Sequence, residues 1–303
     1  MKGIITSLGM IVFAGAVVAG GTGAFFSDTE TSTGNLFTAG AIDLKVDSEQ
    51  HYNGNVCKDV DETNGVNYQW VGTSPYPKAG TSCNGTWTQT DLGLTHKFFD
   101  FGDVKPGDEG ENTISLHIDN NDAWMCADVK ITENSDQTCV DPENDATGEN
   151  GACVVEGAGG VSGDLAQNLW FVAWNDNGVD AEGEKIEGAV PGDNIHQAGE
   201  VLLFEEGPAS NVLNGGTLTI ADGGTNTPIP GGSTQFVGLA WCAGEMEADT
   251  NDSAPTCNGG TMSNVAQTDS MKADITFRVE QARNNGEFRC DARVVETPND
   301  LTT

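Results

Sequence analysis

Short runs in which apolar and polar residues alternate recur along most of the chain. In the segment Ala273–Val279 every second residue is apolar, and this period of two buries one face of a strand and leaves the other in water. Clusters of Gly, Asn, Asp and Pro separate the runs, as turns require, and helical spacing is nearly absent. Strands are predicted at Leu36–Val46, Thr113–Ile118, Val129–Thr132, Leu169–Trp174, Val201–Phe204, Thr217–Ile220, Gln235–Trp241 and Ala273–Glu280.

Many short strands without intervening helices predict an all-β fold, most simply a jelly-roll-like β-sandwich. Two polar, cysteine-bearing segments, near 47–97 and 133–165, interrupt the strand pattern. We interpret them as disulfide-pinned loop insertions and not as separate domains. The sequence therefore predicts one sandwich domain over residues 41–296, with a short tail at 297–303.

The N-terminus has the three parts of a secretory signal peptide. Lys2 precedes the apolar run Ile4–Val18, small residues follow up to Ala24, and the next charged residue is Asp28. Cleavage after Ala24 is predicted, which assigns residues 1–24 to the signal peptide and leaves no stable membrane span. Two alternatives stay open: the run is long enough to remain as a membrane anchor, and Lys2-Gly3 resembles a type IV prepilin cleavage site.

The net charge of the chain argues against some classes of binding partner. The chain of 303 residues carries 46 acidic and 13 basic side chains, a formal net charge of −33. Such a surface argues against nucleic-acid binding, which needs basic patches, and against docking on anionic lipids. The hydrophobic fraction of 37 % is still sufficient for a sizeable core.

Eight cysteines agree with export to an oxidising compartment. Eight cysteines allow 105 pairings, but the spacing suggests three local loops and one long-range bond. The chain has no CxxC motif, which makes a cysteine zinc site or a thioredoxin-type redox site improbable. The predicted pairs are Cys57–Cys83, Cys139–Cys153, Cys242–Cys257 and Cys126–Cys290.

Catalytic signatures are missing from the sequence. It has no HExxH, no GxSxG, no phosphate-binding loop and no GxGxxG after a strand, and its four histidines are scattered. Its 46 carboxylates make accidental acidic pairs inevitable, so their number alone identifies no acid–base pair. No catalytic residue is predicted.

One acidic cluster suggests a calcium loop. The segment 175–184 follows a predicted strand and spaces oxygen-bearing side chains around Gly178, as Ca²⁺ loops do. It lacks the spacing and the flanking helices of an EF-hand, and an acidic hairpin loop is an equally good interpretation. The candidate ligands are Asn175, Asp176, Asn177, Asp180, Glu182 and Glu184, and a weaker example is Asp119-Asn120-Asn121-Asp122.

Four stretches resemble the TasA/camelysin family. The N-terminal block is the most specific of them, and the turn 101–108 resembles the family's L-K-P-G-D turn. The strand and turn 112–122 follow it as they do in the family, and the segment 275–283 resembles its last core strand. The N-terminal block reads Gly20-Gly21-Thr22-Gly23-Ala24-Phe25-Phe26-Ser27-Asp28-Thr29-Glu30, then Gly34-Asn35-Leu36-Phe37-Thr38-Ala39-Gly40 and Leu44-Lys45-Val46.

The resemblance implies a secreted structural protein of a cell surface or biofilm matrix. Fibre-forming members are cut by a dedicated signal peptidase (SipW) and assemble head to tail when the freed N-terminal segment adds a strand to the neighbouring copy. The segment 25–40 is the corresponding candidate donor strand here, with Phe25, Phe26, Leu36 and Phe37 as its apolar contacts. Two alternatives are a camelysin-like secreted metalloendopeptidase and a non-polymerising cell-surface binding protein.

Overall fold

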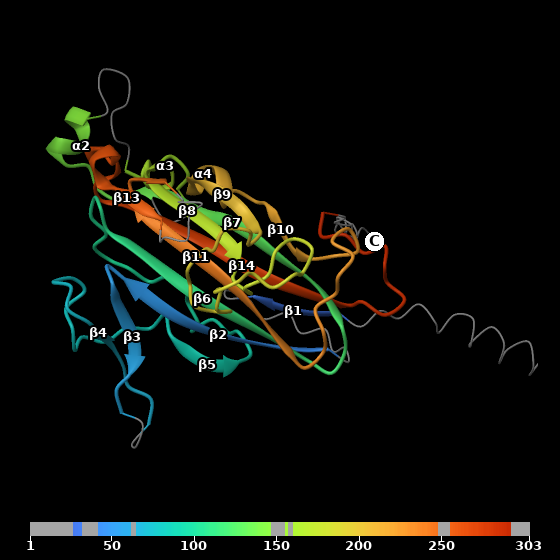
Figure 1. The fold of residues 1–303 in the computed structure, drawn as a ribbon. Helices are drawn as coiled ribbons and strands as arrows, with labels where there is room; N and C mark the ends of the chain where they lie inside the picture. Colours follow the sequence, from blue (N-terminus) through green and yellow to red (C-terminus); the bar gives the residue numbers. More distant parts are fainter. Residues whose placement is uncertain are drawn as a thin grey trace, which may run out of the picture.

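Strict alternation of burial runs through the first long strand, β2 (Asp43–Tyr52), where every second side chain is buried. The computed structural model describes residues 27–31, 42–61, 65–146, 155–156, 160–247 and 255–291. In these ranges the chain forms antiparallel sheets that face each other as a β-sandwich (Figure 1), as the alternation predicts.

The larger sheet is built around β2 and its long neighbours. Its order is β4-β3-β2-β6-β11-β8-β9, and β5 also pairs with β2. The strand β6 pairs with β2 along ten residues and with β11 along its other side. The remaining bounds are β3 (Asn55–Asp59), β4 (Tyr68–Val71), β5 (Trp87–Thr90), β6 (Glu109–Asp119), β8 (Leu169–Asn175), β9 (Leu202–Pro208) and β11 (Ser233–Ala243).

The smaller sheet has the order β1-β14-β7-β10. Its centre is the long antiparallel pair of β7 and β14, which runs from Asp136 opposite Asp269 to Ala123 opposite Gln281. The bounds are β1 (Ser27–Thr31), β7 (Ala123–Asp136), β10 (Thr217–Ala221) and β14 (Asp269–Gln281). A hairpin of β12 (Glu245–Glu247) and β13 (Thr256–Asn258) forms a separate two-stranded sheet.

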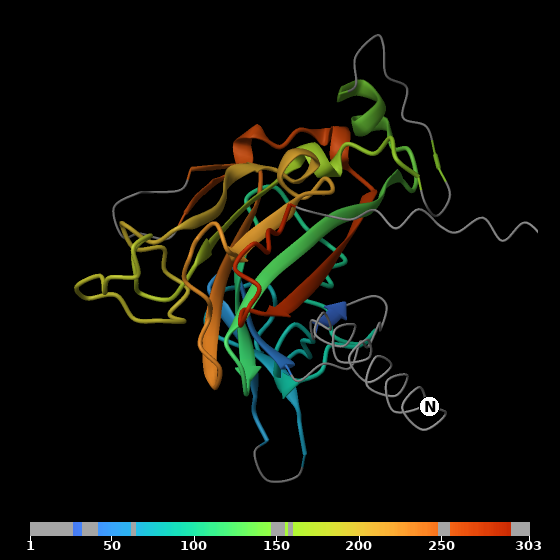
Figure 2. The ribbon, with the colours of Figure 1, turned by 90° about the vertical axis from the view of Figure 1, so that its right-hand side faces the viewer.

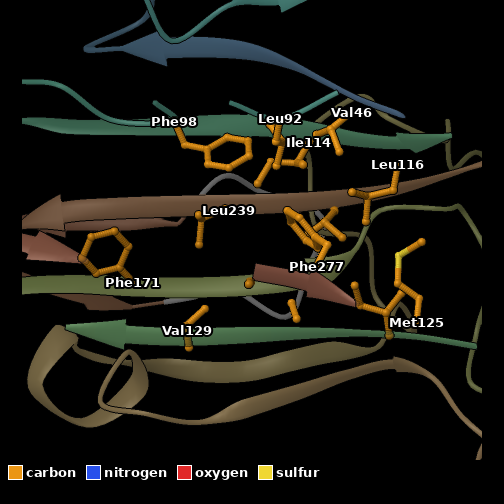
Figure 3. Packing of buried hydrophobic residues seen from close by; sticks show 14 of the residues in the cluster. Val46, Leu92, Phe98, Ile114, Leu116, Met125, Val129, Phe171, Leu239 and Phe277 are labelled. Carbon is orange, nitrogen blue, oxygen red and sulfur yellow. The ribbon is translucent and has the colours of Figure 1, made fainter. Parts of the chain in front are cut away.

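The core lies between the two sheets (Figure 3). The larger sheet contributes residues such as Leu116 and Leu239, and the smaller sheet contributes Met125, Val129 and Phe277. All five are at most 5 % exposed. The apolar face of each sheet covers that of the other. The alternating apolar positions in the sequence therefore explain why the two sheets pack as a sandwich.

Two predicted boundaries need correction, because polar residues are buried at the ends of core strands. The insertion predicted near 47–97 starts only after Tyr52, since Ser48 and Gln50 face inward on β2. Each side chain forms a hydrogen bond there: Gln50 Nε2 donates to Phe98 O at 2.6 Å, and Asn112 Nδ2 donates to Ser48 Oγ at 3.0 Å. Hydrogen bonding makes such burial possible, and hydropathy alone cannot reveal it.

The same correction applies to the segment near 133–165. Its first four residues, Glu133–Asp136, are the buried end of β7. Lys272 Nζ donates to Glu133 Oε2 at 2.9 Å across the strand pair, and Asn134 Nδ2 donates to Gly163 O. The strand predicted at Leu36–Val46 likewise differs: among the described residues it begins at Asp43 and continues to Tyr52.

Disulfides join strands to the segments around them. The structure forms Cys57–Cys83, Cys126–Cys290 and Cys242–Cys257, three of the pairs that the spacing suggests. Cys139 is also disulfide-bonded, while Cys153 lies outside the described residues. The bond of Cys126 closes a sequence separation of 164 residues and ties the segment after β14 to β7.

Helical elements are short and lie at the ends of the strands. They are α2 (Asp141–Ala146), α3 (Leu165–Asn168), α4 (Ala209–Val212), and the 3₁₀ turns η2 (Gly259–Thr261) and η3 (Asn264–Ala266). Throughout the described ranges, no helix has the length and apolar character needed to cross a bilayer.

Candidate functional site

The strand β1 lies on one edge of the smaller sheet. It pairs antiparallel with the C-terminal part of β14, from Ser27 opposite Glu280 to Thr31 opposite Thr276. Figure 2 shows β1, in blue, beside this end of β14. On its other side β14 pairs with β7 along its whole length, so β1 covers the outer edge of β14 over five residues.

The part of β14 that pairs with β1 is anchored by buried side chains and by contacts to β7. Phe277 and Val279 of β14 are buried in the core, at 2 % and 0 % exposure. Between them, Arg278 Nε donates to Asp128 Oδ2 at 2.8 Å, and its Nη2 donates to Cys290 O at 3.1 Å. The disulfide Cys126–Cys290 lies directly beside this pair. This end of β14 is therefore anchored both in the core and to β7.

The predicted assembly residues cannot be placed. Phe25, Phe26, Leu36 and Phe37 lie outside the described residues, as do the predicted cleavage position after Ala24 and the tail 297–303. Only the backbone segment Ser27–Thr31 of the candidate donor strand is described, and it is a strand.

The predicted calcium loop uses its polar groups to close turns. Asp180 Oδ1 accepts hydrogen bonds from the backbone N–H groups of Glu182 and Glu184, at 3.0 and 2.8 Å. Asn177 exchanges two hydrogen bonds with the backbone of Phe236. Glu182 and Glu184 are exposed. The loop thus forms the Asx turns typical of acidic hairpin loops.

Asp176 is the buried member of that loop. Its side chain is fully buried, and Oδ2 accepts from the Asn194 N–H at 2.8 Å. Burial raises the pKa of Asp176 to about 7, and the nearby charges of Glu200 and Asp193 act in the same direction, while the Asn194 N–H opposes them. The Glu200 carboxylate accepts from the Gly178 and Gln197 N–H groups at 2.7 and 3.0 Å. These carboxylates fasten the loop to its own backbone.

A carboxylate cluster that the sequence analysis missed lies at the other end of β14. Asp136 and Asp269 are opposite each other at the end of the β7·β14 pair, and Glu143 reaches them from α2. One carboxylate oxygen from each of the three lies within 4.8 Å of the other two. It is the one group of three or more potential metal-binding side chains among the described residues. Asp136 and Glu143 are 5 % and 1 % exposed.

The cluster is incompletely hydrogen-bonded. Asp269 Oδ2 accepts from the N–H groups of Asp164 and Leu165, at 2.6 and 3.0 Å, but Asp269 Oδ1 has no hydrogen-bond partner. Glu143 Oε2 accepts a long hydrogen bond of 3.3 Å from the Val140 N–H, and Glu143 Oε1 has none. Two buried carboxylate oxygens are thus left without a donor.

Burial and like charge raise the pKa values in this cluster. Burial is the main cause for Asp269, and the Asp136 carboxyl adds to it through a hydrogen bond and its charge, bringing the pKa of Asp269 to about 7. Burial also raises the pKa of Glu143, with the charges of Asp136 and Asp164 in the same direction. No lysine or arginine is among the groups that shift either pKa.

The chain resembles one known protein family at its N-terminus. Residues 2–64 match the family described as Camelysin metallo-endopeptidase. No curated protein matches the chain, and neither does any solved structure. The match covers the signal-like segment, β1 and the first two strands of the larger sheet.

The histidines do not come together with the carboxylate cluster. His51 binds Glu49 and Glu111 at 3.0 and 3.1 Å. His117 binds Asp47 Oδ2 at 2.6 Å. Both lie on the larger sheet, whereas the carboxylate cluster belongs to the end of the smaller sheet. A histidine-based zinc site of the kind common in metallopeptidases is not assembled by the described residues.

Proposed function

We propose that this protein is a secreted structural subunit of an extracellular filament or biofilm matrix, which assembles by exchange of its N-terminal strand between copies. The observation that carries the proposal is β1. It is a five-residue strand added to the edge of β14, and ten residues outside the described ranges separate it from Ile42. The camelysin match over residues 2–64 and the disulfide-bonded cysteines agree with a secreted protein.

The edge pairing can be supplied by the chain itself or by another copy. In the structure β1 completes its own sheet, and this closed form is a monomer. If the N-terminal segment of one copy lies on β14 of the next, each copy both gives and receives a strand. Such a head-to-tail contact does not close on itself, so the product is a filament.

The energetics allow such an exchange. Backbone hydrogen bonds contribute about 0.5–1.5 kcal/mol each, and β1 pairs along five residues only. The described core residues come from strands such as β6, β7, β11 and β14. The segment can therefore leave its own edge without unfolding the domain.

The alternative taken from the matched family is a secreted metalloendopeptidase. Its one supporting observation is the family's description. His51 and His117 bind separate carboxylates on the larger sheet, while His96 and His196 lie in loops with contacts of their own. We therefore keep the structural role as the proposed function.

Electron microscopy of the protein beginning at Phe25 tests the proposal. We expect filaments from this protein and none from a variant lacking residues 25–38, which should stay folded and disulfide-bonded because its core is intact. A deletion of the tail 297–303 is the matched control and should leave filament formation unchanged. Filaments of normal yield from the variant lacking residues 25–38 would show that strand exchange is not the mechanism.

A further inference from the structure

We propose that Asp136, Glu143 and Asp269 form a binding site for a calcium ion at the end of the β7·β14 strand pair. Three separate parts of the chain supply the ligands: the last residue of β7, the helix α2 and the first residue of β14. In Figure 1, α2 lies at the tip of the sandwich, next to the segment that leads into β14.

The arrangement of charges calls for a cation. One oxygen from each of three carboxylates lies within 4.8 Å of the others. Like charges at such distances repel strongly where water is excluded. The fourth carboxyl in the neighbourhood, Asp164, is acidic as well, and burial and the charge of Asp136 raise its pKa. A divalent cation converts this mutual repulsion into attraction.

A second observation is independent of the charge count. Glu143 is only 1 % exposed, yet its Oε1 has no hydrogen-bond partner. Leaving a buried polar atom without a partner is destabilising, and more so when the group is charged. Asp269 Oδ1 is likewise buried without a hydrogen-bond partner. An ion coordinated by these two oxygens would satisfy both.

The loop 175–184 differs from this cluster in how its carboxylates are arranged. Asp180 Oδ1 accepts from two backbone N–H groups, while Asp176 Oδ1 is buried without a hydrogen-bond partner. Among the described residues, however, only Asp136, Glu143 and Asp269 bring oxygens from three such side chains within 4.8 Å of one another.

The donor set selects a hard cation. All three side chains offer oxygen, which favours calcium or magnesium over zinc, whose usual protein ligands include nitrogen or sulfur. Magnesium demands near-ideal octahedral geometry and gives up its water reluctantly, whereas calcium accepts six to eight oxygens in flexible arrangements. A cluster assembled from a helix and two strand ends suits the more tolerant ion.

Calcium-dependent stability tests the site. The protein beginning at Phe25 is stripped with EDTA and then melted with and without CaCl₂, in high NaCl to screen the diffuse negative charge. At a calcium concentration one hundred times the dissociation constant measured by titration calorimetry, we expect the melting temperature to rise by about 5–10 °C. The same concentration of MgCl₂ should raise it less.

Two isosteric substitutions test whether calcium raises the melting temperature through this cluster. Glu143→Gln and Asp269→Asn should each abolish the rise with calcium. In EDTA each variant should be at least as stable as the unaltered protein, because one repelling charge is gone. This opposite response distinguishes an ion site from an ordinary structural contact. Glu206→Gln, which removes an exposed carboxylate on β9, is the matched control and should keep the full rise.

Three outcomes would overturn the proposal. The first is an unaltered protein whose melting temperature is the same in calcium and in EDTA. The second is a Glu143→Gln variant that keeps the calcium response. The third is a response abolished by Asp176→Asn and kept by Glu143→Gln, which would place the ion in the loop near residue 176.

Discussion

The two ends of β14 form different kinds of interaction. At its C-terminal end, the outer edge of residues 276–280 pairs with β1 through the backbone. At its N-terminal end, Asp269 joins two other carboxylates through side chains. Figure 2 shows β1 and α2 at opposite ends of the strand. One end is organised by main-chain pairing and the other by side-chain charge.

The two ends should therefore tolerate different kinds of substitution. Main-chain pairing depends little on which residues form it, so the β1 edge should tolerate most point substitutions of outward-facing residues and fail when the strand is removed. A carboxylate cluster depends on each member, so one isosteric substitution should alter its behaviour.

The largest loss of stability is expected when a core side chain of β14 next to β1 is removed. Phe277 is 2 % exposed and belongs to the core cluster. Phe277→Ala should reduce the free energy of unfolding by about 3–5 kcal/mol, because it leaves a cavity. Urea unfolding measures this loss. If the two ends are independent, the variant retains the calcium-induced rise in melting temperature, and loss of that rise would show that the ends are coupled.

A smaller, pH-dependent effect is expected on the larger sheet, away from both ends. Burial lowers the pKa of His51, but its hydrogen bonds to Glu111 and Glu49 outweigh burial and raise the pKa to about 9. A raised pKa means that the protonated form stabilises the fold fully below the ordinary value near 6.5. This stabilisation is lost as the pH rises through about 9.

Replacing His51 tests whether its protonated form stabilises the fold. His51→Gln should cost about 1–2 kcal/mol of unfolding free energy at pH 6, given the partial exposure of the pair. The difference from the unaltered protein should shrink towards pH 10, as measured by urea unfolding at each pH. A cost that is equal at both pH values would mean that packing, and not protonation, explains the role of His51.

Local patterns predicted much of the fold, but not the carboxylate cluster. The alternation in Ala273–Val279 predicts a strand that the structure confirms within β14. The pattern alone places the inward polar residues Ser48 and Gln50 in a loop, because their hydrogen-bond partners come from distant segments. Sequence reasoning can identify a strand whose pattern is local, and it misreads one whose burial depends on remote partners.

The same limit explains the acidic sites. The residues of 175–184 are contiguous, so proximity in sequence suggests an ion loop. The structure shows two backbone N–H groups bound to Asp180 Oδ1, and calcium binding by this loop stays a prediction. Asp136 and Asp269 are 133 positions apart in the chain and become neighbours only through the register of β7 and β14. No spacing in the sequence indicates that pairing.

A cross-linking experiment tests most directly whether β1 is exchanged between copies. Thr31 lies opposite Thr276 in the β1·β14 register, so one variant carries Thr31→Cys and a second carries Thr276→Cys. The two are mixed under assembly conditions and oxidised, and the products are separated without reductant. A Glu205→Cys variant, altered on β9 at the edge of the larger sheet, replaces the second as the control.

We expect a disulfide-linked dimer from Thr31→Cys mixed with Thr276→Cys, and none above background from Thr31→Cys mixed with the Glu205→Cys control. Such a dimer requires β1 of one copy to lie on β14 of another. The contradicting result is a mixture that yields no dimer, while a single chain carrying both Thr31→Cys and Thr276→Cys forms the bond internally. In that case β1 completes only its own sheet, and the filament mechanism is wrong.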